Sequence, residues 1–188
     1  MLPPDHATDP AARSQMFGHP KQTTLGEIDS FIPTLPREYQ AYAHLIRSTA
    51  IYPEYALLLH VNFVEDLWQR HGFVRATRLL SSIPPSDVAP YLLVTEIRGR
   101  RKQTLRRNRV AADSEPPNVF LDYKARPITI AMANAAFARA SKRNQVHPAI
   151  TPALIRESVL LASLAEPVDS QIGDIGEELN TGEMEGET

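Results

Sequence analysis

The chain has 188 residues, of which 43% are apolar, and a formal net charge of -2, values typical of one domain with a single hydrophobic core. It contains no cysteine, which excludes disulfides, thiolate nucleophiles and thiolate metal sites. No apolar stretch approaches the roughly 18 to 20 residues that cross a bilayer, and the N-terminus lacks the pattern of a signal peptide, so we expect a cytoplasmic protein without membrane insertion.

The beginning of the chain is rich in proline and has no apolar period, which predicts a flexible N-terminal arm over residues 1–35. A single folded domain is then expected over residues 36–165. Its first helix is predicted over residues 36–50, where Pro36 occupies a first-turn position and apolar residues follow at helical spacing.

The next segment predicts the central helix of the core. An apolar stripe runs along residues 53–72, and Gly72 is a typical stop signal. A buried strand over residues 57–64 is the alternative, because a short apolar run does not distinguish helix from strand by its period. A short helix is expected over residues 73–80, and the prolines that follow it predict a loop.

Two later segments have the composition of strands. Residues 91–97 form an apolar, partly β-branched run, and residues 118–123 form a second one. The two are expected to pair as a hairpin with the basic residues between them at its tip. Helices are predicted over residues 127–144, with cations in the last turn, and over residues 152–165, with Thr151 as N-cap. The expected fold class is therefore α+β: a helix-rich single domain with a small sheet.

Basic residues are concentrated in the middle of the chain. Residues 98–143 hold twelve Lys and Arg against three acidic residues, and seven of the twelve fall within residues 98–109, which we call the basic segment. This density favours binding to a phosphate backbone, and the arginine fork holds phosphate oxygens in bidentate geometry. DNA is therefore the predicted partner. The predicted phosphate-binding residues are Arg98, Arg100, Arg101, Lys102, Arg106, Arg107, Arg109, Lys124 and Arg126.

The end of the chain carries the opposite charge. Eight acidic residues and no Lys or Arg follow Ala165, which predicts a disordered acidic tail over residues 166–188. Such a tail could occupy the basic segment in competition with nucleic acid, or serve solubility alone. The alternative function is therefore a non-enzymatic adaptor or regulatory protein whose basic segment binds an acidic partner protein or this tail.

One carboxylate, Glu96, stands within the apolar run beside the basic segment. It could bind a divalent cation or orient a water for phosphodiester or nucleotide hydrolysis, or it could face outward and pair with an arginine. The six histidines show no spacing typical of a metal site, so no metal ligands are predicted. Four side chains near the cations are candidates either for contacts with bases or for core packing: Tyr91, Asn118, Phe120 and Tyr123.

Parts of the chain resemble the ParB/sulfiredoxin superfamily. The similar pieces are residues 82–90 (SIPPSDVAP), the Gly-Arg-Arg triplet at 99–101 and residues 124–150, and they lie within a span of about a third of the chain. The glutamate of the family's Gly-Glu-Arg-Arg box is absent here. Lys-Ala-Arg at 124–126 is the other candidate counterpart of that box.

This resemblance implies an α+β protein that binds DNA and nucleotide, with ATP and Mg²⁺ as cofactors, and that acts as a DNA-cleaving phosphodiesterase (a nuclease) or an ATPase. The superfamily includes fertility-inhibition proteins, which block conjugative DNA transfer between cells. The resemblance therefore also implies type IV secretion or relaxosome proteins as partners. In that case Glu96 and Arg100 would be the catalytic residues. Arg100 and Arg101 would clamp the phosphates, with Arg98 and Arg126 as supporting cations.

Overall fold

The computed structural model describes residues 23–83 and 89–165, and in these residues it contains helices and turns but no β-strand. Extended backbone pairs only in two isolated bridges, between His60 and Asn118 and between Leu121 and Pro127. The helices are α2 (Leu25–Phe31), η1 (Ile32–Thr34), α3 (Arg37–Thr49), α4 (Pro53–Leu57), α5 (Val61–Leu80), α6 (Ala89–Thr95), η2 (Glu96–Arg101), α7 (Lys102–Arg107), η3 (Ala112–Ser114), α8 (Ile130–Arg143) and α9 (Pro152–Ala165).

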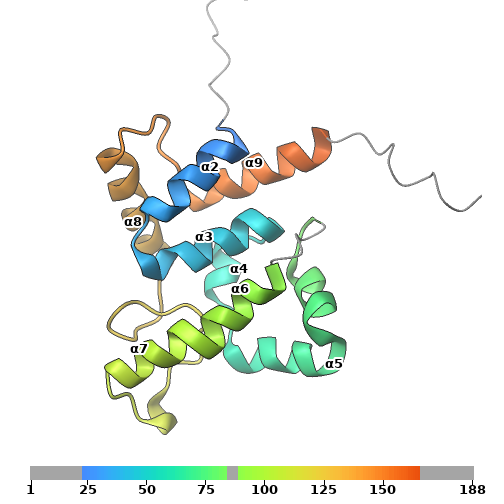
Figure 1. Cartoon of the computed structure of the whole chain (residues 1–188), viewed down its shortest axis with the longest axis vertical. Helices are drawn as coiled ribbons and strands as arrows, with labels where there is room; N and C mark the ends of the chain where they lie inside the picture. The colour runs from blue at the N-terminus through green and yellow to red at the C-terminus, as the bar shows by residue number, and fades with distance from the viewer. Residues whose placement is uncertain (1–22, 84–88, 166–188) are drawn as a thin grey trace, which may run out of the picture.

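Helix α3 occupies the centre of the fold. It packs against α6 on one side and against α9 on the other, and α2 also packs against α9 (Figure 1). The buried side of α3 contributes Tyr42, whose ring meets Phe120 and Phe137 edge to face with centroids 5.8 and 6.4 Å apart. The helix predicted over residues 36–50 is confirmed, and it ends at Ala50 in the left-handed region with φ 49°.

The last two helices also form where the sequence predicts them. Helix α8 lies within residues 127–144, and the hydroxyl of Thr129 caps its first turn. Lys142 and Arg143 lie in its last turn, where cations oppose the negative end of the helix dipole. Helix α9 fills the predicted range of residues 152–165.

The first predicted strand is helical. Helix α6 continues through η2, a π-helical stretch, into α7, and we call residues 89–107 the long helix (Figure 1). Leu93, Ile97, Arg101 and Leu105 are buried along it at intervals of four residues, a spacing that places them on one face of a helix. The strand prediction was wrong because a seven-residue apolar run fits either period, and here the run continues as a helix into charged sequence.

The second predicted strand does not belong to a sheet either. Residues 118–123 are buried at Val119, Phe120 and Leu121, but they pair only through the isolated bridges. Because the basic segment lies in η2 and α7, it does not form the tip of a hairpin. The α+β class with a small sheet is therefore wrong for the described residues, which form a helical domain.

The folded body begins earlier than the predicted arm over residues 1–35 allows. The Thr24 hydroxyl accepts the Glu27 N–H at 3.2 Å and the Glu27 carboxylate accepts the Thr24 N–H at 2.8 Å, a capping box that starts α2. Ile28 and Phe31 then join the core. The Thr-x-x-Glu spacing signals this helix within a proline-rich context. The predictions for residues 1–22, for the acidic tail and for most of the proline loop lie outside the described residues.

The central helix predicted over residues 53–72 is divided. Helix α4 is short, and α5 starts at Val61 and continues past Gly72, which contradicts the strand alternative over residues 57–64. Gly72 has φ 72° and ψ 163°, so it kinks α5 instead of ending it. The short helix predicted over residues 73–80 forms the second half of α5.

We expect Gly72→Ala to lower the free energy of unfolding by about 1 kcal/mol, because a Cβ there meets no atom within 4 Å but the positive φ disfavours any L side chain. Urea unfolding measures the change. Gly26→Ala is the matched control: it lies in α2 with equally open surroundings, and it should stabilise the protein by roughly 0.5 to 1 kcal/mol. Equal stabilisation by both substitutions would contradict the kink.

Candidate nucleic-acid interface

A concave surface lies between the C-terminal part of the long helix and the start of α3. It encloses about 630 Å³. Three of its arginines, Arg37, Arg106 and Arg107, are exposed, and none of them forms an ion pair with another described residue. We call this surface the basic groove; its lining consists of Arg37, Glu38, Arg100, Gln103, Thr104, Arg106, Arg107 and Tyr123.

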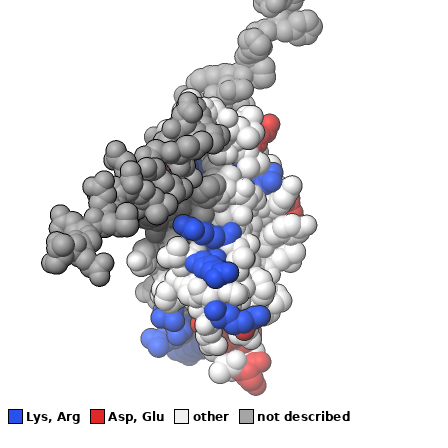
Figure 2. Space-filling model, turned by 90° about the vertical axis from the view of Figure 1, so that its right-hand side faces the viewer, with Lys and Arg blue, Asp and Glu red and all other residues white. Residues whose placement is uncertain are grey.

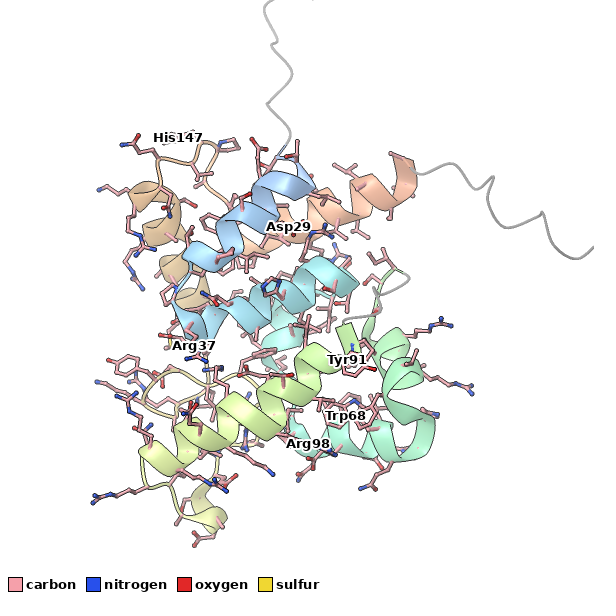
Figure 3. All side chains as sticks on the ribbon, in the orientation of Figure 1. Asp29, Arg37, Trp68, Tyr91, Arg98 and His147 are labelled. Atoms are coloured by element: carbon pink, nitrogen blue, oxygen red, sulfur yellow. The ribbon has the colours of Figure 1, made fainter. Side chains whose placement is uncertain are left out.

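The arginines of the long helix do not all point toward the basic groove. Figure 3 shows Arg37 at the start of α3 on the side of α7, whereas Arg98 lies near Trp68 of α5. The Arg98 guanidinium carbon is 5.9 Å from the Trp68 ring centroid and 5.8 Å from that of Phe73. Arg98 is exposed, and its cation–π contacts are with α5, away from the basic groove.

The two predicted catalytic residues, Glu96 and Arg100, form an ion pair whose carboxylate is buried. Arg100 Nε donates to Glu96 Oε2 at 2.8 Å, Arg100 Nη2 bonds the other carboxylate oxygen, and the guanidinium also reaches the carbonyl of Leu121 at 3.3 Å. The Glu96 side chain is 3% exposed and that of Arg100 is 17% exposed. Burial raises the pKa of Glu96, and its pairing with Arg100 opposes this shift. The alternative of a Glu96 that faces outward and pairs with an arginine is right about the pairing, but the side chain faces inward.

The surroundings of Glu96 do not fit the magnesium ion that the family resemblance implies. Both carboxylate oxygens accept hydrogen bonds from one arginine. Within residues 23–83 and 89–165, no group of three or more His, Cys, Asp or Glu side chains could hold a metal ion. Arg100 is committed to Glu96 and to a carbonyl, so neither residue is available to a phosphate in this geometry, and no hydrolytic step follows from it.

Arg101 is a structural residue. Its side chain is 6% exposed; its Nε donates to the carbonyl of Asn118 at 3.1 Å, and its other nitrogens bond the carbonyl of Pro116 and the carboxylate of Glu115. The π-helical stretch explains why two successive arginines turn inward. In a π-helix the hydrogen bonds join residues i and i+5, so each turn holds more residues than in an α-helix. The residues four and five positions after Glu96, which are Arg100 and Arg101, then lie near the same face as Glu96.

The other predicted cations of the basic segment are exposed. Lys102, Arg106, Arg107 and Arg109 all face solvent and form no ion pair among the described residues. Only Arg106 and Arg107 line the basic groove. Helical spacing therefore divides the basic segment into inward, outward and groove-lining members.

Lys124 and Arg126 lie on a turn over residues 122–126, which we call the Asp122 turn. Asp122 Oδ1 accepts the backbone N–H groups of Lys124 at 2.8 Å and Arg126 at 2.9 Å, while Oδ2 accepts the Arg126 guanidinium at 2.9 and 2.7 Å. Burial of Asp122 acts to raise its pKa, but these hydrogen bonds outweigh burial and hold the pKa below its usual value. The turn presents Tyr123 to solvent, with 62% of the residue exposed.

A second concave surface shares Tyr123 with the basic groove. It encloses about 410 Å³, and its cations are Arg126 and Arg139. We call it the side hollow; its lining consists of Tyr39, Asp122, Tyr123, Arg126, Ala131, Met132, Ala135 and Arg139. Sequence reasoning missed Arg37 and Arg139, because each stands outside the basic segment on a separate helix and only the fold brings them near it.

The four candidates for base contacts are separated by the fold. Phe120 is buried in the core, and the Asn118 side chain donates to the carbonyl of Leu57 at 3.1 Å. Tyr91 is 71% exposed on α6 and Tyr123 is 62% exposed. Of the four, only Tyr123 lines the basic groove.

Basic side chains also occur outside the basic groove. Figure 2 shows the face on the right-hand side of Figure 1, where α5 lies, and basic side chains appear on it in separate spots with few acidic ones. Helix α5 contributes the exposed residues Arg75 and Arg78. These two arginines lie on a different helix from α7 and serve as matched controls for total charge.

Comparison with protein-family models, curated proteins and solved structures finds no match to this chain. The resemblance to the ParB/sulfiredoxin superfamily therefore stays a prediction, and the function has to be inferred from the surface. No helix in the described part of the chain combines the length and the apolar character needed to span a membrane.

We expect Arg100→Ala to lower the free energy of unfolding by about 3 kcal/mol at pH 8, because it leaves a buried carboxylate unpaired. The loss should be smaller at pH 5, where Glu96, whose pKa is already raised, can take up a proton. Arg107→Ala, on the exposed side of α7, should change stability by less than about 0.5 kcal/mol.

Chemical denaturation of the two variants at both pH values measures these differences. The double variant Glu96→Leu with Arg100→Met should recover most of the stability lost by Arg100→Ala, since removing both charges leaves neither unpaired. Equal stability of Arg100→Ala and Arg107→Ala would contradict a structural role for the ion pair.

Proposed function

We propose that the chain binds nucleic acid through the basic groove and the adjoining Asp122 turn. The observation that carries this proposal is the convergence of Arg37, Arg106 and Arg107, from two separate helices, on one concave surface without carboxylate partners among the described residues. Unpaired guanidinium groups on a concave surface suit the oxygens of a phosphate backbone, because each presents several donors in fixed geometry.

The neighbouring residues add to this surface. Arg139, which forms no ion pair with another described residue, extends the positive charge into the side hollow, where Arg126 is already paired with Asp122. Gln103 and Thr104 offer neutral hydrogen-bonding groups inside the basic groove. Glu38 is the one carboxylate that lines the basic groove, so the net charge of its described lining stays positive. A surface of this composition binds a polyanion with an affinity that depends on salt.

The second candidate function is that of an adaptor whose basic groove holds an acidic protein segment. The acidic residues beyond Ala165 favour this candidate, because they supply a polyanion within the same chain. The two functions are compatible if the acidic segment competes with nucleic acid for one surface. Inhibition of conjugative DNA transfer, with type IV secretion or relaxosome partners, and nuclease or ATPase activity stay predictions of the family resemblance.

We expect Arg106→Glu with Arg107→Glu to weaken binding to an oligonucleotide by about tenfold or more, because each substitution replaces a phosphate partner with a repelling charge. Fluorescence anisotropy measures the dissociation constant. For the unaltered protein, three phosphate contacts should make binding roughly 20- to 40-fold weaker at 200 mM than at 50 mM salt, and the double variant should show a smaller salt slope.

The matched control is Arg75→Glu with Arg78→Glu on α5, which changes the net charge by the same amount outside the basic groove. It should keep most of the affinity. A chain that ends at Ala165 should bind more tightly than the full chain if the acidic residues compete. Equal losses in both double variants would indicate attraction by total charge alone and would contradict a defined interface.

A further inference from the structure

Tyr123 stands between two groups of cations. It lines the basic groove together with Arg106 and Arg107, and it lines the side hollow together with Arg126 and Arg139. More than half of its surface is open to solvent. A large aromatic ring gains no burial energy in such a position unless a partner covers it. An exposed aromatic ring with arginines on both sides is the arrangement with which proteins bind unpaired bases and their backbone together.

The backbone that carries the ring is held in place before any ligand arrives. The buried Asp122 carboxylate fixes the turn through its bonds to Lys124 and Arg126. The side-chain amide of Asn108, just after α7, donates to the Tyr123 carbonyl at 3.0 Å and so ties the turn to the basic groove. Lys124 Nζ lies 5.5 Å from the Tyr123 ring centroid. A preorganised turn loses little backbone entropy on binding.

We infer that Tyr123 stacks on an unpaired base, so that the interface takes single-stranded nucleic acid in preference to a duplex. This inference rests on the proposed function, because the arginines on either side must hold the backbone. In a duplex each base face is covered by its neighbours in the stack, and a protruding ring meets only base edges or phosphates. In a single strand every base offers an open face, so the ring adds affinity without base specificity.

The inference is tested by fluorescence anisotropy with three probes: a labelled dT20 strand, a labelled 20-base-pair duplex, and inorganic polyphosphate as a competitor without bases. Tyr123→Ala should weaken binding to dT20 by roughly 5- to 150-fold, the range of one lost base stack, and should leave the inhibition constant of polyphosphate unchanged. Tyr123→Phe keeps the ring and should bind dT20 as the unaltered protein does.

Tyr91→Ala is the matched control, because Tyr91 is also an exposed tyrosine but lies on α6 outside both concave surfaces. It should not affect dT20 binding. Thermal melts confirm that all variants remain folded. Equal affinity of Tyr123→Ala and the unaltered protein for dT20, or tighter binding of the duplex than of dT20, would overturn the inference and leave the proposed function in place.

Two further outcomes separate the inference from the function on which it rests. If the protein binds none of the three probes, the proposed function fails and the inference fails with it. Polyglutamate serves as a second competitor without bases. If its inhibition constant against dT20 equals that of polyphosphate, and Tyr123→Ala changes neither constant, the surface recognises charge alone. That result would favour the acidic protein segment as the occupant of the basic groove and would overturn base stacking.

Discussion

Two inward-facing arginines, Arg100 and the buried Arg101, hold the long helix and the extended segment 115–123 together. Arg100 connects Glu96 to the carbonyl of Leu121, and Arg101 bonds two further carbonyls of this segment. Since these donors are arginines, each satisfies several buried acceptors at once. They fix the start of the Asp122 turn against η2, next to α7, and the basic groove lies where the turn and the long helix meet. The most concentrated positive charge of the sequence thus serves partly to build the interface.

The helices of the fold were largely predictable, whereas the lack of a sheet in the described residues was not. In α3 and α8 the apolar residues recur at helical spacing over more than ten positions, long enough to exclude a strand. The run of residues 91–97 is too short for this test, and its helical character depends on contacts of α6 with α3 and α5 that the sequence does not display. In the sequence, Gly72 has the pattern of a helix stop, and only the structure shows that the chain continues as the second half of α5.

The positive charge of the candidate site was predictable from the sequence, but the residues that form the site were not. Clustered cations indicate a partner with negative charge, and this prediction needs no structure. The π-helical stretch lets Arg100 and Arg101 both turn inward, and it has no sequence signature comparable to an N-cap. Arg37 and Arg139 join the interface from helices far away in sequence. Glu96 was a catalytic candidate by its position in the sequence, and the structure pairs its carboxylate with Arg100 inside the fold.

The central claim is that nucleic acid lies on the basic groove and the Asp122 turn and not on the α5 face. Photo-crosslinking with a 4-thiothymidine strand, followed by mass spectrometry of the peptides, tests it most directly because it reports which residues touch bases. The account predicts adducts on Tyr123 and on peptides of α7. Adducts confined to the Trp68 and Phe73 region of α5, or an absence of adducts at Tyr123 under conditions where the strand is bound, would contradict it.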